Sequence, residues 1–183
     1  MSKCILRDNT VICDYDRPYI VAEVNSSHNG DSEVAKHMID AAVEAGADCV
    51  KFQSWSAESL YSKTYYDANP ISKRIIKKLS MTPEQLVDMS HYCLEKGIAF
   101  SSTPYSEEEV DFLVDACKAP FIKVSSMEIN NLKFLSYIGS KGVPIVLSTG
   151  MSTMDEIDIA VKTLEKAGVN QLVLLHCVSV YPT

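Results

Sequence analysis

The sequence predicts an α/β protein of the (β/α)8 TIM-barrel type that is truncated after about six β/α units. Short apolar runs recur along the chain, and helical patterns lie between most of them. Such alternation is typical of parallel strands joined by right-handed crossovers. A complete barrel typically needs about 250 residues, so the 183 residues are expected to form one incomplete barrel domain, 1–183. The expected strands are Tyr19–Glu23, Cys49–Gln53, Ala99–Thr103, Phe121–Ser125, Ile145–Ser148 and Leu172–His176.

The expected helices carry start and stop signals. Thr82 with Gln85 forms a capping box, Pro83 occupies the favoured first helical position, and Gly97 provides the stop. Ser106 is followed by three glutamates, which the helix dipole favours in a first turn. The helices are therefore expected over 32–45, 82–97, from 106 onward, 132–140 and 153–168.

Composition and charge exclude several classes of protein. The net charge is −7, so the chain lacks the general basic character that suits nucleic-acid binding. No apolar run approaches the roughly 20 residues that span a bilayer, and no signal peptide opens the chain. The six cysteines include no C-x-x-C pair, which favours reduced cysteines in a cytoplasmic protein. We therefore expect a cytoplasmic protein with neither a membrane nor a nucleic-acid partner. The first expected strand is not followed by a glycine-rich nucleotide-binding motif, which disfavours a nucleotide-binding fold.

One connection, 54–80, is unusually long and carries both lysines and tyrosines. Connections of this length are usually functional or mobile. Two interpretations stay open: a solvated, partly helical excursion, or a lid over an anionic substrate.

Polar side chains end the expected strands, where barrel enzymes place their sites. Because side chains alternate along a strand, Lys51 and Gln53 share one face, and Lys123 opposes its apolar neighbours. The residues expected around one mouth are Glu23, Lys51, Gln53, Thr103, Lys123, Ser148 and His176. Two lysines beside hydroxyl groups indicate a site for phosphate or carboxylate. Two alternatives are an ion pair between one lysine and Glu23, and a Schiff-base lysine.

Three further segments contain candidate residues. The segment 123–131 adds Ser125, Ser126 and Glu128, and Glu128 either handles protons or caps a helix. The backbone of 148–152 enters a helix and is suited to cradle phosphate. The segment 28–31 is best explained as a turn followed by a helix cap. His176 has no second ligand nearby in the sequence, so no metal site within this chain is expected.

Six motifs in register give the chain a resemblance to a known family. They are Ala22-Glu23 with His28-Asn29-Gly30, Val50-Lys51-Phe52-Gln53, Ser102-Thr103-Pro104, Lys123-Val124-Ser125-Ser126-Met127-Glu128-Ile129-Asn130, Leu147-Ser148-Thr149-Gly150-Met151, and Leu175-His176-Cys177 with Tyr181-Pro182. From about Tyr19 to its last residue, the chain resembles the sialic acid synthase family, which includes N-acetylneuraminate, legionaminate and pseudaminate synthases.

The resemblance implies a (β/α)8 barrel that condenses phosphoenolpyruvate with an N-acetylated amino sugar, N-acetylmannosamine or a diacetamido relative. Phosphate leaves by C–O cleavage, and a divalent metal, Mn2+ or Mg2+, polarises the aldehyde. By similarity, Lys51, Lys123, Ser126 and Ser148 would bind phosphoenolpyruvate, and Glu23 and Glu128 would be catalytic. Gln53, Thr103, Ser179 and Tyr181 would line the sugar side. The family does not use a Schiff base.

The chain departs from the family pattern toward its C-terminal end. The family's metal-binding histidines come from strands seven and eight, and an antifreeze-like domain follows them; neither region is present in the 183 residues. We therefore expect a fragment whose metal ligands lie beyond residue 183, which is inactive alone and forms a homodimer at full length. An alternative is a truncated, non-catalytic paralogue that binds an anionic ligand. The acceptor sugar is left open.

Overall fold

The computed structural model describes residues 2–180, which fall into two compact units. One unit is Tyr19–Ala119, and the other combines the chain up to Pro18 with the chain from Pro120 onward. Within residues 2–180, no helix is long and apolar enough to cross a membrane. All six cysteines are free thiols, and burial raises the pKa of Cys93 and of Cys117 to about 12.

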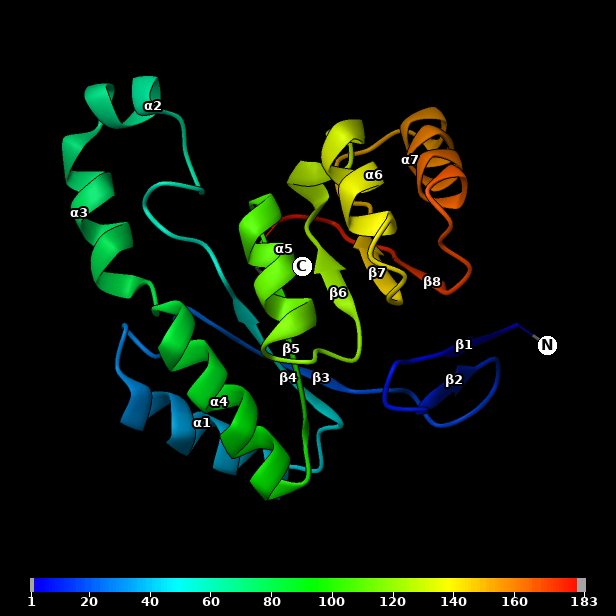
Figure 1. The fold of residues 1–183 in the computed structure, drawn as a ribbon, viewed down its shortest axis with the longest axis horizontal. Helices are drawn as coiled ribbons and strands as arrows, with labels where there is room; N and C mark the ends of the chain where they lie inside the picture. The colour runs from blue at the N-terminus through cyan, green and yellow to red at the C-terminus, as the bar shows by residue number, and fades with distance from the viewer. Residues whose placement is uncertain (1, 181–183) are drawn as a thin grey trace. The chain divides into compact units, whose positions relative to one another are not determined.

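The unit Tyr19–Ala119 contains a parallel sheet with the order β3-β4-β5. The strands are β3 (Val21–Asn25), β4 (Cys49–Gln53) and β5 (Ala99–Thr103), and the helices are α1 (Ser32–Glu44), α2 (Lys63–Ala68), α3 (Pro70–Leu79), α4 (Pro83–Lys96) and α5 (Glu107–Asp115). Helices α1 and α4 pack side by side, with α1 against β3 and α4 against β5 (Figure 1). Phe52 of β4 is fully buried and stacks on Phe100 of β5 with ring centroids 5.5 Å apart.

Local sequence signals explain where these helices begin. At α4, Thr82 Oγ1 accepts a hydrogen bond from Gln85 N, and Gln85 Oε1 accepts one from Thr82 N, which completes the expected capping box. Gly97 ends the helix with φ +72°, a left-handed conformation that glycine adopts without strain. At α1, Asp31 caps the first turn by accepting from Glu33 N and Val34 N, as the turn-and-cap interpretation of 28–31 predicted.

The long connection 54–80 is partly helical, since it contains α2 and α3. It also has a small core of its own: Trp55, Ala57, Tyr66 and Ile76 are buried together. The excursion interpretation is therefore confirmed in its helical content, and the burial of Trp55 fixes the start of the segment close to β4.

The second unit contains a parallel sheet with the order β6-β7-β8 and a separate antiparallel hairpin. The elements are β1 (Lys3–Ile5), β2 (Val11–Cys13), β6 (Ile122–Val124), the 3-10 helix η1 (Ser126–Glu128), α6 (Leu132–Gly139), β7 (Ile145–Ser148), α7 (Met154–Lys166) and β8 (Leu172–Leu175). Helices α6 and α7 lie side by side (Figure 1). At α7, Thr153 and Glu156 form a reciprocal capping box.

The alternating β/α units confirm the predicted α/β class, and all six expected strands are present with small changes in their ends. The first expected strand extends to Asn25, because a register irregularity between Glu23 and Asn25 inserts an extra residue. The last strand ends at Leu175, so His176 follows it directly. The hairpin β1–β2 was not predicted.

Candidate active site

One group of predicted site residues lies on the sheet β3-β4-β5. Glu23 is paired in register with Lys51, and Lys51 Nζ forms an ion pair with Glu23 Oε2. Lys51 Nζ also donates to Thr103 Oγ1 at 3.5 Å, a long hydrogen bond. Lys51 is 7% exposed, whereas the side chain of Glu23 is 46% exposed. The ion pair that the sequence left open as an alternative is therefore present, with its carboxylate end open to solvent.

Gln53 and Thr103 are register partners on β4 and β5. The side chain of Gln53 is oriented by its neighbour, since Trp55 Nε1 donates to Gln53 Oε1 at 2.7 Å. Thr103 is 2% exposed and meets Lys51. Both residues thus stand beside Lys51 and Glu23 at the carboxyl ends of parallel strands, where α/β enzymes bind ligands.

A second group lies on β6 and β7. Lys123 Nζ donates to Ser148 Oγ at 2.6 Å and to the carbonyl oxygen of Val124 at 2.8 Å. Lys123 is 8% exposed and Ser148 is 7% exposed. A buried ammonium beside a hydroxyl group is an arrangement that binds phosphate or carboxylate oxygens through charge-assisted hydrogen bonds.

The turn that follows β7 adds hydroxyl groups and a backbone N–H to this second group. Gly150 N donates to Ser126 Oγ at 2.9 Å. A Cβ at position 150 would clash with Ser179 Oγ and lie 3.0 Å from Ser126 Oγ, so only glycine allows these hydroxyls to approach so closely. Ser125 Oγ is buried and has no hydrogen-bond partner within the described residues. The structure thus brings Ser126 and Ser179 together, as an anion-binding turn would require.

Glu128 lies at the end of the 3-10 helix η1, half-buried, where its Oε2 accepts a hydrogen bond from Asn131 Nδ2 at 2.9 Å. It does not cap α6, because Asn131 itself accepts from Phe134 N. The helix-cap alternative for Glu128 is therefore wrong for α6. Tyr181 lies outside the described residues.

The histidine that follows β3 serves the structure. His28 is 2% exposed, its Nδ1 accepts from Gly30 N at 3.0 Å, and burial lowers its pKa. No group of three His, Cys, Asp or Glu side chains that could hold a metal ion occurs within residues 2–180. The described residues therefore offer no set of ligands for the divalent metal implied by the resemblance.

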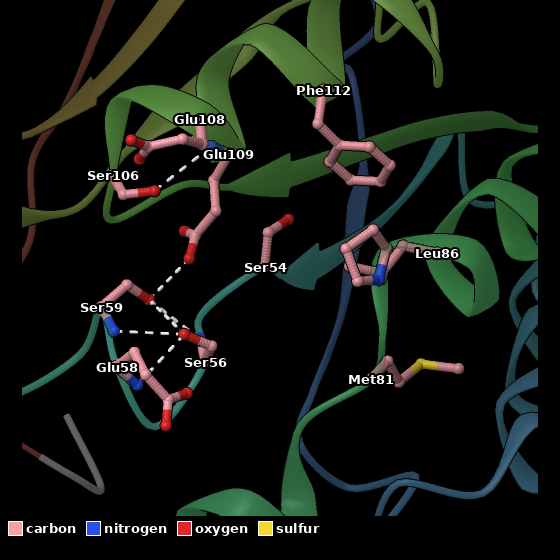
Figure 2. Close-up of a pocket in the computed structure, with 11 residues that line it drawn as sticks. Ser54, Ser56, Glu58, Ser59, Met81, Leu86, Ser106, Glu108, Glu109 and Phe112 are labelled. Atoms are coloured by element: carbon pink, nitrogen blue, oxygen red, sulfur yellow. Dashed lines mark hydrogen bonds between the residues drawn. The ribbon is translucent and has the colours of Figure 1, made fainter.

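Sequence reasoning missed one half-buried carboxylate, that of Glu109. The three glutamates after Ser106 were interpreted only as first-turn negative charge, yet Glu109 turns into a pocket of about 380 Å3 (Figure 2). There it accepts hydrogen bonds from Ser59 and from the backbone N–H of Tyr105. No sequence signal separates Glu109 from Glu108, because only the packing of 54–59 beside α5 decides which carboxylate is half-buried and which is exposed.

Comparisons with known proteins agree with the geometry. The NeuB family matches residues 38–183. The chain is 36% identical over 177 residues to the N,N'-diacetyllegionaminic acid synthase of Legionella pneumophila, covering 90% of this chain and 49% of the relative. It is 34% identical over 176 residues to the N-acetylneuraminate-9-phosphate synthase of Drosophila melanogaster, covering 92% and 47%. The chain thus spans about half the length of the curated relatives it matches.

Solved structures give the same result. The sialic acid synthetase of Leptospira borgpetersenii, solved with citrate, matches all of this chain and 61% of its own at a TM-score of 0.90 and 27% identity. A truncated 3-deoxy-D-arabino-heptulosonate 7-phosphate synthase of Thermotoga maritima shares the fold alone, with a TM-score of 0.63 and 13% identity over 85% of this chain and 50% of its own. The barrel-type fold class and the resemblance to sialic acid synthases are both confirmed, and the chain belongs to the NeuB family.

Proposed function

We propose that this chain carries phosphoenolpyruvate-binding and catalytic residues of a synthase that condenses phosphoenolpyruvate with an N-acetylated amino sugar. The products are a sialic-acid-type nonulosonate and inorganic phosphate. The observation that carries the proposal is the buried Lys123–Ser148 pair, with the Ser126–Gly150 turn beside it. A ligand that combines a phosphate with a carboxylate matches this set of donors, and family membership supplies the reaction class.

The proposed role of each residue follows from its chemistry. In the proposal, Lys51, Lys123, Ser126 and Ser148 bind the anionic groups of phosphoenolpyruvate. The methylene carbon of phosphoenolpyruvate attacks the aldehyde carbon of the sugar, which forms the C–C bond and leaves a cationic centre at the enol carbon. Water adds to that centre, the C–O bond to phosphate breaks, and the aldehyde oxygen ends as a hydroxyl group.

Two carboxylates are suited to that cationic centre. Glu23 has its solvent-open end beside Lys51, and Glu128 is half-buried at the end of η1. We assign both to stabilising the developing positive charge or to moving the protons of water addition. Lys51 Nζ forms an ion pair with Glu23 Oε2, and the two residues are partners in the sheet register.

The acceptor side is assigned to Gln53, Thr103, Ser179 and Tyr181. The legionaminic acid synthase and the N-acetylneuraminate-9-phosphate synthase carry the names of different products, yet they are 36% and 34% identical to this chain, so identity does not choose the acceptor. N-acetylmannosamine, its 6-phosphate and a diacetamido sugar all stay in the proposal. The homodimer and the divalent metal expected at full length are likewise part of it.

The test begins with the reading frame beyond Thr183, and the complete protein is then assayed with phosphoenolpyruvate and the three acceptors. Mass spectrometry should show a new nonulosonate formed in step with released phosphate. Phosphoenolpyruvate labelled with heavy oxygen at its bridging position should give labelled phosphate, because the C–O bond breaks. Binding that raises the melting temperature without any product would instead support the non-catalytic paralogue. Absence of both binding and product in a folded protein would refute the proposal.

A further inference from the structure

Two segments leave the sheet β3-β4-β5 immediately after residues assigned to the acceptor side. The segment 54–59 follows Gln53, and the turn 104–106 follows Thr103. A single carboxylate, Glu109, contacts both segments. Figure 2 shows its contact with Ser59.

The two oxygens of Glu109 are shared between the two segments. Ser59 Oγ donates to Glu109 Oε1 at 2.5 Å, and Tyr105 N donates to Glu109 Oε2 at 2.7 Å. Ser59 is itself held in a tight turn, where Ser56 N donates to Ser59 Oγ at 2.9 Å and Ser59 N donates to Ser56 Oγ at 3.1 Å. Ser106 fixes the other end by capping Glu109 N at 3.2 Å. Any displacement of Glu109 therefore breaks hydrogen bonds in both segments.

Glu109 makes these hydrogen bonds in partly desolvated surroundings. The pocket that it faces is lined on one side by the apolar side chains of Met81, Leu86 and Phe112, and elsewhere by serine and glutamate side chains (Figure 2). Burial raises the pKa of Glu109, while the hydrogen bonds from Ser59 and Tyr105 oppose the rise. In such surroundings a charge-assisted hydrogen bond is stronger than in water, and leaving a partner unsatisfied is more costly.

A second link reinforces the same pair of segments. Ser54 Oγ lies 2.5 Å from Ser102 Oγ, and both residues are buried. Ser54 and Ser102 are the neighbours of Gln53 and Thr103. The carboxyl ends of β4 and β5 are thus joined by the contact between Ser54 and Ser102. The segments that follow these strands are joined by Glu109.

We infer that Glu109 is a positioning residue, which holds the segments after β4 and β5 and thereby orients Gln53 and Thr103 toward the acceptor sugar. This inference rests on the proposed function, because it assumes that these two residues serve the acceptor. Glu109 touches no substrate in this role and acts through its hydrogen bonds to the Ser59 side chain and the Tyr105 backbone.

The test compares Glu109→Ala, Glu109→Gln and the control Glu108→Ala in the complete protein. Glu108 carries the same charge one residue earlier, is exposed, and lies in the same first turn. Hydrogen exchange measured by mass spectrometry should be faster than in the wild type at 54–62 and 104–106 for Glu109→Ala. For Glu108→Ala it should equal the wild-type rate in both segments. In Glu109→Ala, the KM for the acceptor should rise about tenfold or more, with the KM for phosphoenolpyruvate unchanged. For Glu109→Gln, the exchange rates and the acceptor KM should lie between those of the wild type and Glu109→Ala. The amide oxygen of glutamine still accepts from Ser59, while its NH2 group cannot accept from Tyr105 N.

Each outcome decides the inference. Unchanged exchange in Glu109→Ala would overturn it, and so would faster exchange with an unchanged acceptor KM. An equal rise in both KM values would also overturn it, since that would indicate a general structural role. A wild-type protein that makes no product with any acceptor would refute the proposed function and the acceptor role together, and hydrogen exchange would still show whether Glu109 joins the two segments.

Discussion

Replacing Lys123 by methionine removes the ammonium group that meets Ser148 Oγ at 2.6 Å, while a side chain of similar length remains to fill the space. Lys123 is 8% exposed, so its charge acts within a largely dehydrated environment. Under the proposed function, that ammonium donates to an oxygen of phosphoenolpyruvate, and methionine cannot. We therefore predict that Lys123→Met weakens binding of phosphoenolpyruvate while the fold is kept.

The magnitude follows from the kind of hydrogen bond that is lost. A hydrogen bond to a charged group contributes about 1.5–3 kcal/mol, and about 1.4 kcal/mol corresponds to a tenfold change in affinity. The Kd should accordingly rise by about 10- to 150-fold. The effect on stability should be small by comparison, because the loss of a donor for Ser148 Oγ is offset by no longer burying a charge.

Isothermal titration calorimetry with phosphoenolpyruvate gives the Kd of the wild type, of Lys123→Met and of the control Lys166→Met. Lys166 is an exposed lysine near the end of α7, so its replacement removes the same charge without touching Lys123 or Ser148. Near-ultraviolet circular dichroism shows whether each variant keeps its packing. A folded Lys123→Met protein with the Kd of the wild type would refute the assignment of Lys123 to the anion site.

Three further predictions concern stability. Leu135→Ala should lower the free energy of unfolding by about 2–5 kcal/mol, because Leu135 is fully buried in α6, and urea unfolding that shows a loss below about 1 kcal/mol would contradict this. Thr153→Ala should lower the free energy of unfolding by about 1 kcal/mol, because it removes the capping box of α7. Thr163→Ala, toward the C-terminal end of the same helix, should cost less, and equal losses in thermal unfolding would argue against the cap. Burial raises the pKa of Glu109, so the native state holds this proton more tightly than the unfolded chain does. The unfolding free energy of the wild type minus that of Glu109→Gln should therefore fall as the pH rises from about 4 to 7, and a rise measured by urea unfolding at each pH would show that the sign is wrong.

Local sequence signals determined most of the secondary structure. Helix caps and stops act within one turn of the chain, so they can be recognised from the sequence alone. Examples are the caps at Thr82 and Thr153 and the stop at Gly97. The hairpin β1–β2 was missed because its strands are only three residues long and show no usable periodicity. Its turn is stabilised by Asp8, whose side chain accepts from Thr10 N, and by Asn9 at φ +68°.

Side-chain alternation also placed the candidate residues correctly on their strands. Lys51 stands beside Glu23 in register, and Gln53 stands beside Thr103, as strand ends in a parallel sheet require. The prediction of an anion site at these strand ends followed from residue type and period alone.

The sequence by itself determined which side chains reach the carboxyl ends of the strands, because alternation along a strand and capping at a helix end are properties of neighbouring residues. Only the tertiary structure decided which partner each side chain has. Lys51 pairs with Glu23, whereas Lys123 donates to Ser148. Glu109, and not Glu108, is the glutamate that turns inward to join two segments. These choices depend on strand register and on the packing of residues about 25 to 50 positions apart, and no local pattern in the chain encodes such separations.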